Sequence, residues 1–343
     1  MTRSSRLDDA AAVAGRRAFL FATAGAALAL TGCSSGSDDA EAKPAGATAS
    51  DGFPVTVQGK EGAARVTAPP RRVAACGYLR DTDIALALGA PLVLAAKNNV
   101  FPDGLAPWQK PASDPVLIDT TAGMPMEKVA AARPDLILAS DDYQLHDDYA
   151  KLSRIAPTLS YRKGVGQDGW EDMARRAGDA LGARSEADAL VSRVRRKIAS
   201  VRKAHPELDG RTFTFGPVVG GEVFTIKSPD DASAVFFGQL GMKLSPKVVR
   251  LPDSATPGRA AVAKERLDLL DADVLILTFD TDQARKEFEA RPLFKKLGAV
   301  RRGAYIGLDM PTAIAVGFPS VLSLPYGLDA VVPRLAKAAR RHA

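Results

Sequence analysis

Residues 126–138, MEKVAAARPDLIL, and residues 264–277, KERLDLLDADVLIL, repeat one pattern in the two halves of the chain. In each stretch a Glu begins a short amphipathic segment, an Asp follows eight residues later, and an apolar run comes directly after the Asp. A continuous apolar run is typical of a parallel strand that is buried on both faces. A helix, a tight turn and a buried strand in each half therefore predict an α/β protein with two similar lobes.

The first 32 residues have the composition of an export signal. Arginines within residues 3–17 precede an apolar run at 18–30, which is shorter than the roughly 20 residues that a membrane-spanning helix needs. The run ends in LTGC at 30–33, which resembles a bacterial lipobox and predicts cleavage before Cys33 and lipidation of its thiol. Residues 15–20, GRRAFL, resemble a twin-arginine signal, but Sec signals also carry arginines, so the export route stays open.

Residues 33–52 are rich in Ser, Gly, Ala and Asp, contain no aromatic residue, and predict a flexible tether. Since several acyl chains anchor a protein durably, we expect an extracytoplasmic protein held on the outer face of the cell membrane. Removal of residues 1–32 deletes four arginines and two aspartates, which lowers the formal net charge from +6 to +4. A charge this small and dispersed does not indicate nucleic-acid binding.

The rest of the chain is long enough for two lobes. Residues 53–183 alternate short apolar strands with helices, which predicts a first lobe around a parallel sheet. Residues 184–205 carry an apolar stripe at helical spacing and predict a single connecting helix about 30 Å long, whose basic face is solvated. Residues 206–343 return to strands and helices, with a loop expected at 309–319 and a final helical region at about 320–340 that is interrupted at Pro325 and Pro333. The predicted fold is two Rossmann-like α/β lobes joined by one long helix.

Ligands of parallel α/β sheets lie beyond the carboxyl ends of the strands, and polar and aromatic residues follow the predicted strands here. Cations at this edge can pair with acidic oxygens of a ligand, and aromatic rings can pack against its organic part. The predicted ligand contacts are Tyr78, Arg80, Asn98, Tyr143, Arg162, Trp170, Lys227, Arg259 and Phe318. Residues 164–169, GVGQDG, match G-x-G-x-x-G, but no return strand follows the next helix, so the pattern predicts a loop at the mouth of the site rather than a dinucleotide site.

Six segments of the chain, in a fixed order, together carry a family resemblance. They are the lipobox, RRVAACGYLRDTDIALALGA at 71–90, MEKVAAARPDLILAS at 126–140, YAKLSRIAPTLSY at 149–161, the long helix, and AKERLDLLDADVLIL at 263–277. Over residues 60–340 the chain resembles the substrate-binding lipoproteins of iron–siderophore ABC importers, a family that also includes vitamin B12 and haem binders. The resemblance implies a monomer that captures a ferric siderophore between its lobes and delivers it to an ABC permease dimer. It also implies that Glu127 and Glu265, one in each lobe, dock onto permease arginines.

Other ligands and other classes of protein stay open. A cobalamin or haem carrier of the same family is one alternative, and an exported lipoprotein enzyme is another. Beyond the tether the chain has no G-x-S-x-G elbow, and Cys76 has no second cysteine besides Cys33 as a redox partner, so we expect neither an enzyme nor a bound cofactor. His146, His205 and His342 are the only histidines, which argues against a direct metal site. The sequence does not choose between hydroxamate, catecholate and mixed chelators.

Overall fold

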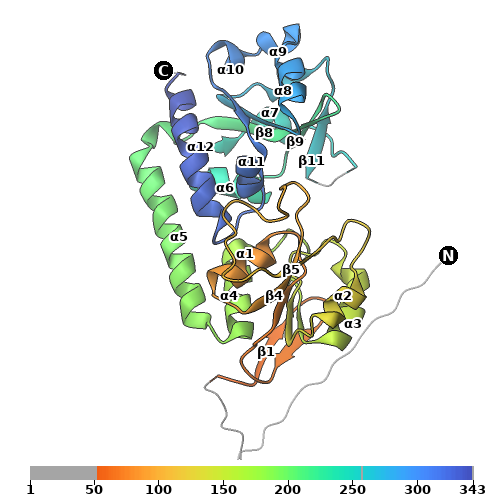
Figure 1. The fold of residues 1–343 in the computed structure, drawn as a ribbon. Helices are drawn as coiled ribbons and strands as arrows, with labels where there is room; N and C mark the ends of the chain where they lie inside the picture. Colours follow the sequence, from red (N-terminus) through yellow and green to blue (C-terminus); the bar gives the residue numbers. More distant parts are fainter. Residues whose placement is uncertain (1–51, 256–257, 342–343) are drawn as a thin grey trace, which may run out of the picture. The chain divides into compact units, whose positions relative to one another are not determined.

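Two sheets, one in each half of the chain, form the framework of the molecule (Figure 1). The computed structural model describes residues 52–255 and 258–341, all within one compact unit, Thr48–Ala343. The predicted signal peptide, Cys33 and the tether up to residue 51 lie outside the described residues. Two α/β lobes built on separate sheets confirm the predicted fold class.

The first lobe contains a β-hairpin and a five-stranded, wholly parallel sheet. Its elements are β1 (Val55–Gln58), β2 (Ala63–Val66), β3 (Val73–Ala75), α1 (Arg80–Ala87), β4 (Leu92–Ala96), β5 (Val116–Ile118), α2 (Met126–Ala131), β6 (Leu136–Leu138), α3 (Leu145–Ile155), β7 (Thr158–Leu159) and α4 (Trp170–Leu181). The strand order is β5–β4–β3–β6–β7, so the chain winds outward from β3 in both directions. This topology opens a crevice beyond the carboxyl ends of β3 and β6.

The second lobe is built on a mixed sheet in the order β11–β9–β8–β12–β13, with β10 beside β8. Its elements are η1 (Pro206–Leu208), β8 (Thr212–Val219), β9 (Glu222–Ile226), α6 (Ala232–Gln239), β10 (Lys243–Leu244), α7 (Pro246–Val249), β11 (Arg259–Val262), η2 (Leu267–Leu270), β12 (Val274–Phe279), α8 (Asp282–Glu289), α9 (Pro292–Lys295), α10 (Gly298–Arg301), β13 (Tyr305–Leu308), α11 (Met310–Gly317) and α12 (Ser323–Arg340). Strands β8, β12 and β13 are parallel, whereas β9 and β11 are antiparallel to their neighbours.

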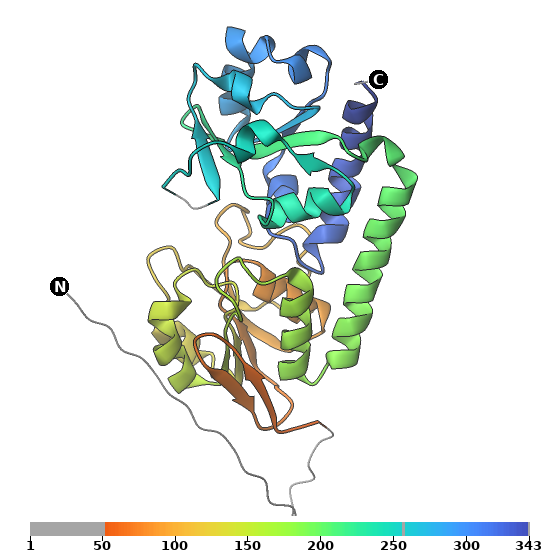
Figure 2. The ribbon, with the colours of Figure 1, turned by 180° about the vertical axis from the view of Figure 1, so that it is seen from behind.

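A single helix, α5 (Arg184–Ala204), connects the lobes and runs beside both of them (Figures 1 and 2). Its buried stripe packs against α4 of the first lobe and against α6 and α12 of the second. Lys197 Nζ lies 2.6 Å from Asp329 Oδ2 on α12, which adds an ion pair to this packing. The N-cap residue of α5 is Ala183, and the Ser185 hydroxyl donates to the Glu186 carboxylate at 2.9 Å.

The aspartates of the repeated stretches hold neighbouring strands together in both lobes. The Asp135 carboxylate accepts the backbone N–H groups of Arg71 at 2.7 Å and Arg72 at 2.9 Å, which ties the turn before β6 to the start of β3. The Asp273 carboxylate accepts the backbone N–H of Thr212 at 2.8 Å, and the Asp273 N–H donates to the Thr212 hydroxyl at 3.0 Å. These bonds tie the turn before β12 to the start of β8. The repeated Asp therefore has the same structural role twice.

Three local predictions from the sequence are wrong. The helix expected after Glu265 is only the 3₁₀ turn η2, whereas Glu127 does lie in the first turn of α2. Residues 309–319, expected as a loop, contain α11, because the Asp309 side chain caps it by accepting the Thr312 N–H at 2.8 Å. Helix α12 is continuous through Pro333 rather than interrupted there.

Candidate functional site

Aromatic rings from both lobes meet beyond the carboxyl ends of β3 and β6. Tyr78 follows β3, and its ring centroid lies 4.9 Å from that of Phe318 in the second lobe and 6.2 Å from that of Tyr143, which follows β6. Tyr143 is 58% exposed, whereas Tyr78 and Phe318 are half-buried. These three predicted residues form an aromatic wall in the crevice that the strand order opens.

An apolar cluster continues this contact between the lobes. Leu79, Phe101 and Ala106 of the first lobe are buried together with Ile314 of α11. Their burial joins the loops after β3 and β4 to the second lobe through the hydrophobic effect, which is proportional to the apolar area removed from water. The two lobes are therefore in direct apolar contact at this point.

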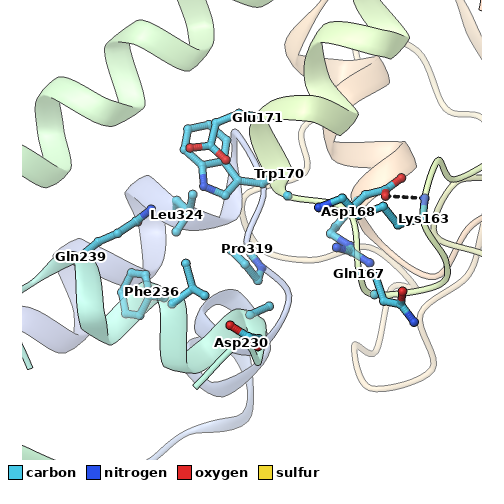
Figure 3. A pocket seen from close by; sticks show the side chains of 15 residues that line it. Lys163, Gln167, Asp168, Trp170, Glu171, Asp230, Phe236, Gln239, Pro319 and Leu324 are labelled. Atoms are coloured by element: carbon cyan, nitrogen blue, oxygen red, sulfur yellow. Dashed lines mark hydrogen bonds between the residues drawn. The ribbon is translucent and has the colours of Figure 1, made fainter. Parts of the chain in front are cut away.

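Two cavities lie near this crevice, and Phe318 of the aromatic wall lines one of them. One, of about 330 Å³, is lined by both lobes (Figure 3): the loop at 163–169 and the start of α4 face α6, Pro319 and Leu324. The other, of about 360 Å³, is lined by the second lobe alone, through the ends of β8 and β12, Arg259, α11 and Phe318. Pro319 lines the first cavity and the preceding residue, Phe318, lines the second, so one segment contributes to both. Both volumes fall within the range of small-molecule sites.

One side of the first cavity mixes apolar side chains with Asp230, Glu171 and Gln239, and the other side is a loop. Trp170 on α4, Phe236 on α6 and Leu324 on α12 lie on one side, and the loop with Lys163 lies on the other (Figure 3). This loop folds around Asp168, whose carboxylate accepts the backbone N–H groups of Arg162 at 2.5 Å and Lys163 at 2.8 Å. The G-x-G-x-x-G segment thus forms part of a cavity wall. Trp170, predicted as a ligand contact, is only 6% exposed, so it presents little more than an edge.

Arg80 lines the first cavity, but its guanidinium is bonded to Asp141. Arg80 is 3% exposed, and its Nε donates to Asp141 Oδ1 at 2.8 Å. Asp141 Oδ2 accepts the backbone N–H groups of Leu79 at 3.1 Å and Arg80 at 2.9 Å. The pair therefore fixes the turn from β3 into α1. Asp141 was not among the predicted site residues, although two acids directly after a buried strand are a signal that could have identified it.

The other predicted cations also have carboxylate partners. Arg259 Nη2 lies 3.1 Å from Asp231 Oδ2 and lines the second cavity. Lys227 pairs with Asp253 at 3.0 Å, and the exposed Arg162 pairs with Asp172 at 3.3 Å. Asn98, predicted as a ligand contact, is 2% exposed, and its Oδ1 accepts the Val100 N–H at 3.1 Å. Asn98 therefore shapes the loop after β4.

A buried carboxylate, Asp83, joins the two lobes. The Asp83 carboxylate accepts Trp108 Nε1 at 3.1 Å and Gln109 Nε2 at 2.7 Å within the first lobe, and the Ser320 hydroxyl of the second lobe. Trp108 also packs against Tyr326 of α12, with ring centroids 4.9 Å apart and ring planes tilted by 44°. Asp83 is not among the predicted site residues, and it lies within α1 with its carboxylate facing the other lobe.

The stability of the protein should depend on the protonation of Asp83. Burial raises the pKa of Asp83 to about 7, and its three hydrogen bonds offset only part of this rise. Because the pKa in the folded state exceeds the ordinary value of 3.8, the folded state holds the proton more tightly than the unfolded state between these pH values. Stability from this group is therefore present at low pH and lost as the pH rises through about 7.

We expect Asp83→Asn to make stability less dependent on pH, because Asn keeps an acceptor and cannot ionise. The loss of unfolding free energy between pH 5.5 and 8, measured by urea denaturation, should be smaller than in wild type by about 2 kcal/mol. Burial also raises the pKa of Asp81 to about 7 and that of Asp142 to about 6, so part of the pH dependence should remain. An unchanged or steeper dependence in the variant would contradict this assignment.

The two repeated glutamates are exposed, one on each lobe. Glu127 lies on α2, and Glu265 lies in the turn before η2, beside a groove that Lys247, Leu293 and Lys296 also line. Both carboxylates are accessible to a partner, and neither residue lines the two cavities described above.

Neither a membrane span nor a metal-binding cluster occurs in the part of the chain that the structure describes. None of its helices combines the length and the apolar character needed to cross a membrane. Across residues 52–255 and 258–341, no three His, Cys, Asp or Glu side chains are grouped so that they could hold a metal ion.

Comparisons with known proteins place this fold and cleft in a family. A periplasmic solute-binding protein from Mycobacterium smegmatis is 28% identical, with a TM-score of 0.73, and the match covers 83% of this chain and 98% of that one. PiaA from Streptococcus pneumoniae TIGR4, in complex with ferrichrome, is 25% identical, with a TM-score of 0.71 and coverage of 83% and 99%. FhuD2 from Staphylococcus aureus with bound ferrioxamine B is 20% identical, with a TM-score of 0.61 and coverage of 79% and 100%, and shares the fold. No curated protein sequence matches the chain. The family profile of periplasmic binding proteins matches residues 75–312, more than half of the sequence, and the chain belongs to this family.

Proposed function

We propose that this protein captures a ferric siderophore in the cleft between its lobes and delivers it to an ABC permease. The observation that carries the proposal is the aromatic wall, Tyr78, Tyr143 and Phe318, which both lobes build at the crevice beyond β3 and β6. PiaA, a similar protein from an iron-uptake ABC transporter, binds ferrichrome, which supports this class of ligand.

The chemistry of the cleft suits a metal that arrives already chelated. A siderophore surrounds ferric iron with hard oxygen donors, so the protein need not supply ligands to the metal. What remains outside is the organic part of the chelator, which aromatic rings can cover with a large contact area and little loss of side-chain entropy. The half-buried Phe318 and the exposed Tyr143 offer such surfaces.

We expect Tyr143→Ala and Phe318→Ala each to weaken binding of a ferric trihydroxamate by about tenfold or more, because buried aromatic contacts dominate such sites. Affinity is measured by titrating the purified protein and following tryptophan emission, since Trp170 lines the first cavity. Val116→Ala is the matched control: it removes an exposed apolar side chain from the edge strand β5. No affinity for any hydroxamate or catecholate complex would refute the proposal.

We further propose that lipid on Cys33 holds the protein at the outer face of the membrane. The lipobox at 30–33 and the tether at 33–52 support this localisation. Cys33→Ala should move the protein from the membrane fraction to the soluble fraction and abolish its labelling by a radioactive fatty acid. A variant that stays membrane-bound, or a wild-type chain that takes up no label, would contradict the anchor.

A further inference from the structure

Charges around the second cavity cancel. Arg259 is the charged side chain in its lining, and Asp231 Oδ2 lies 3.1 Å from the Arg259 guanidinium. The Asp231 side chain also accepts the Ser233 N–H at 2.9 Å and so caps α6. The carboxylate that neutralises Arg259 is therefore held in place by the fold, and a ligand cannot easily displace it.

Charges around the first cavity cancel as well. Arg80 is neutralised by Asp141, Asp168 pairs with Arg176 at 3.6 Å, and Glu171 pairs with Arg195 at 3.2 Å. The two other charged side chains in the lining, Lys163 and Asp230, have opposite signs. Taken with the partners of its lining residues, this cavity has no net formal charge.

The charged groups buried next to the Arg80–Asp141 pair are acidic, so they add no positive charge to the cleft. Asp81 and Asp142 are buried close to the Arg80–Asp141 pair, with the Asp81 carboxylate accepting the Asp141 N–H at 2.9 Å. The Asp142 Oδ2 atom has no hydrogen-bond partner among the described residues. A charged ligand that enters the cleft therefore meets balanced charges, and the buried groups next to Arg80 are acids rather than further cations.

The main classes of ferric chelate differ in net charge, so a site with balanced charges should bind them with different affinities. Each hydroxamate carries one negative charge, so a ferric trihydroxamate is neutral, whereas each catecholate carries two, so a ferric tris-catecholate is a trianion. Moving a charged group out of water without an opposing charge is costly. We infer that the site selects neutral or cationic ferric trihydroxamates and rejects anionic catecholate complexes. The inference rests on the proposed function and names the chelator class within it.

A direct comparison of complexes tests this inference. The full-length protein in detergent is titrated with ferrichrome, with ferrioxamine B, and with the ferric complex of a hexadentate tris-catecholate, and binding is followed by calorimetry. We expect both hydroxamates to bind at least about a hundredfold more tightly than the tris-catecholate. Equal or tighter binding of the trianion overturns the inference and leaves the proposed function standing. If none of the three complexes binds, the proposed function itself fails.

A variant that removes the negative charge beside Arg259 tests whether charge balance causes the selectivity. Asp231→Asn frees the Arg259 charge, while Asn still serves as an N-cap. The ratio of affinities between tris-catecholate and ferrichrome should shift about tenfold toward the tris-catecholate. Asp209→Asn is the matched control, because it frees Arg202 at the end of α5, and it should leave the ratio unchanged. If Asp231→Asn leaves the ratio unchanged, or the control shifts it equally, charge balance in the cleft is not the source of selectivity.

Discussion

Replacing Arg80 by Ala is expected to lower the unfolding free energy by about 3–5 kcal/mol, because it leaves the buried carboxylate of Asp141 without its counterion. Asp141 is fully buried, and without Arg80 Nε it keeps only the N–H groups of residues 79 and 80. A loss of this size is a large fraction of the roughly 5–15 kcal/mol that stabilises most domains. Urea denaturation followed by circular dichroism measures it.

The control variants separate the ion pair from a general effect of losing an arginine. Arg162→Ala removes an exposed partner of Asp172 and should cost less than about 1 kcal/mol. Combining Arg80→Met with Asp141→Asn removes both charges and should recover much of the loss. Arg80→Lys, which keeps the charge, should be intermediate, and it remains informative if Arg80→Ala does not fold. A loss below about 1 kcal/mol in Arg80→Ala would show that Asp141 does not depend on this pair.

The double change Glu127→Ala with Glu265→Ala is expected to abolish uptake of a ferric siderophore and to leave ligand affinity unchanged. Both glutamates are exposed, neither lines the cavities of the cleft, and we propose that they dock onto the permease. Loss of opposed charges at an interface slows association and weakens binding. Uptake of radioactive iron by whole cells and titration of the purified protein measure the two properties separately.

Other exposed glutamates provide the matched control for this prediction. Glu186 at the start of α5 and Glu287 on α8 are both exposed. Glu186→Ala with Glu287→Ala removes the same amount of charge and should transport normally. Uptake that survives the loss of Glu127 and Glu265, or that fails equally in the control, would disprove their role in docking.

The fold could be predicted because its main signals are local. Apolar runs such as 136–138 and 274–279 become fully buried strands, and the stripe of α5 matches the helical period. The errors fall where a contact distant in sequence or a short cap decides the structure. Asp309 starts a helix in the predicted loop at 309–319, and the 3₁₀ turn after Glu265 replaces an α-helix.

The site could be predicted only in part, because pairing between charged side chains is not visible in a sequence. The positions of Tyr78, Tyr143 and Phe318 follow from the rule that ligands lie beyond parallel strands, and the structure brings these rings together. The sequence predicts Arg80 and Arg259 as cations that are available to pair with a ligand. Their partners Asp141 and Asp231 lie 61 and 28 residues away along the chain, and only the folded structure brings them into contact.

The continuity of α5 affects how empty and loaded protein compete for the permease. The helix has no glycine or proline within residues 184–204 and packs on both lobes, so it acts as a stiff spacer between α2 and the turn before η2. If Glu127 and Glu265 dock as we propose, their separation changes little when the cleft fills. Empty protein would then occupy the permease almost as well as loaded protein. Iron uptake should consequently slow when this protein is produced in excess over its cargo.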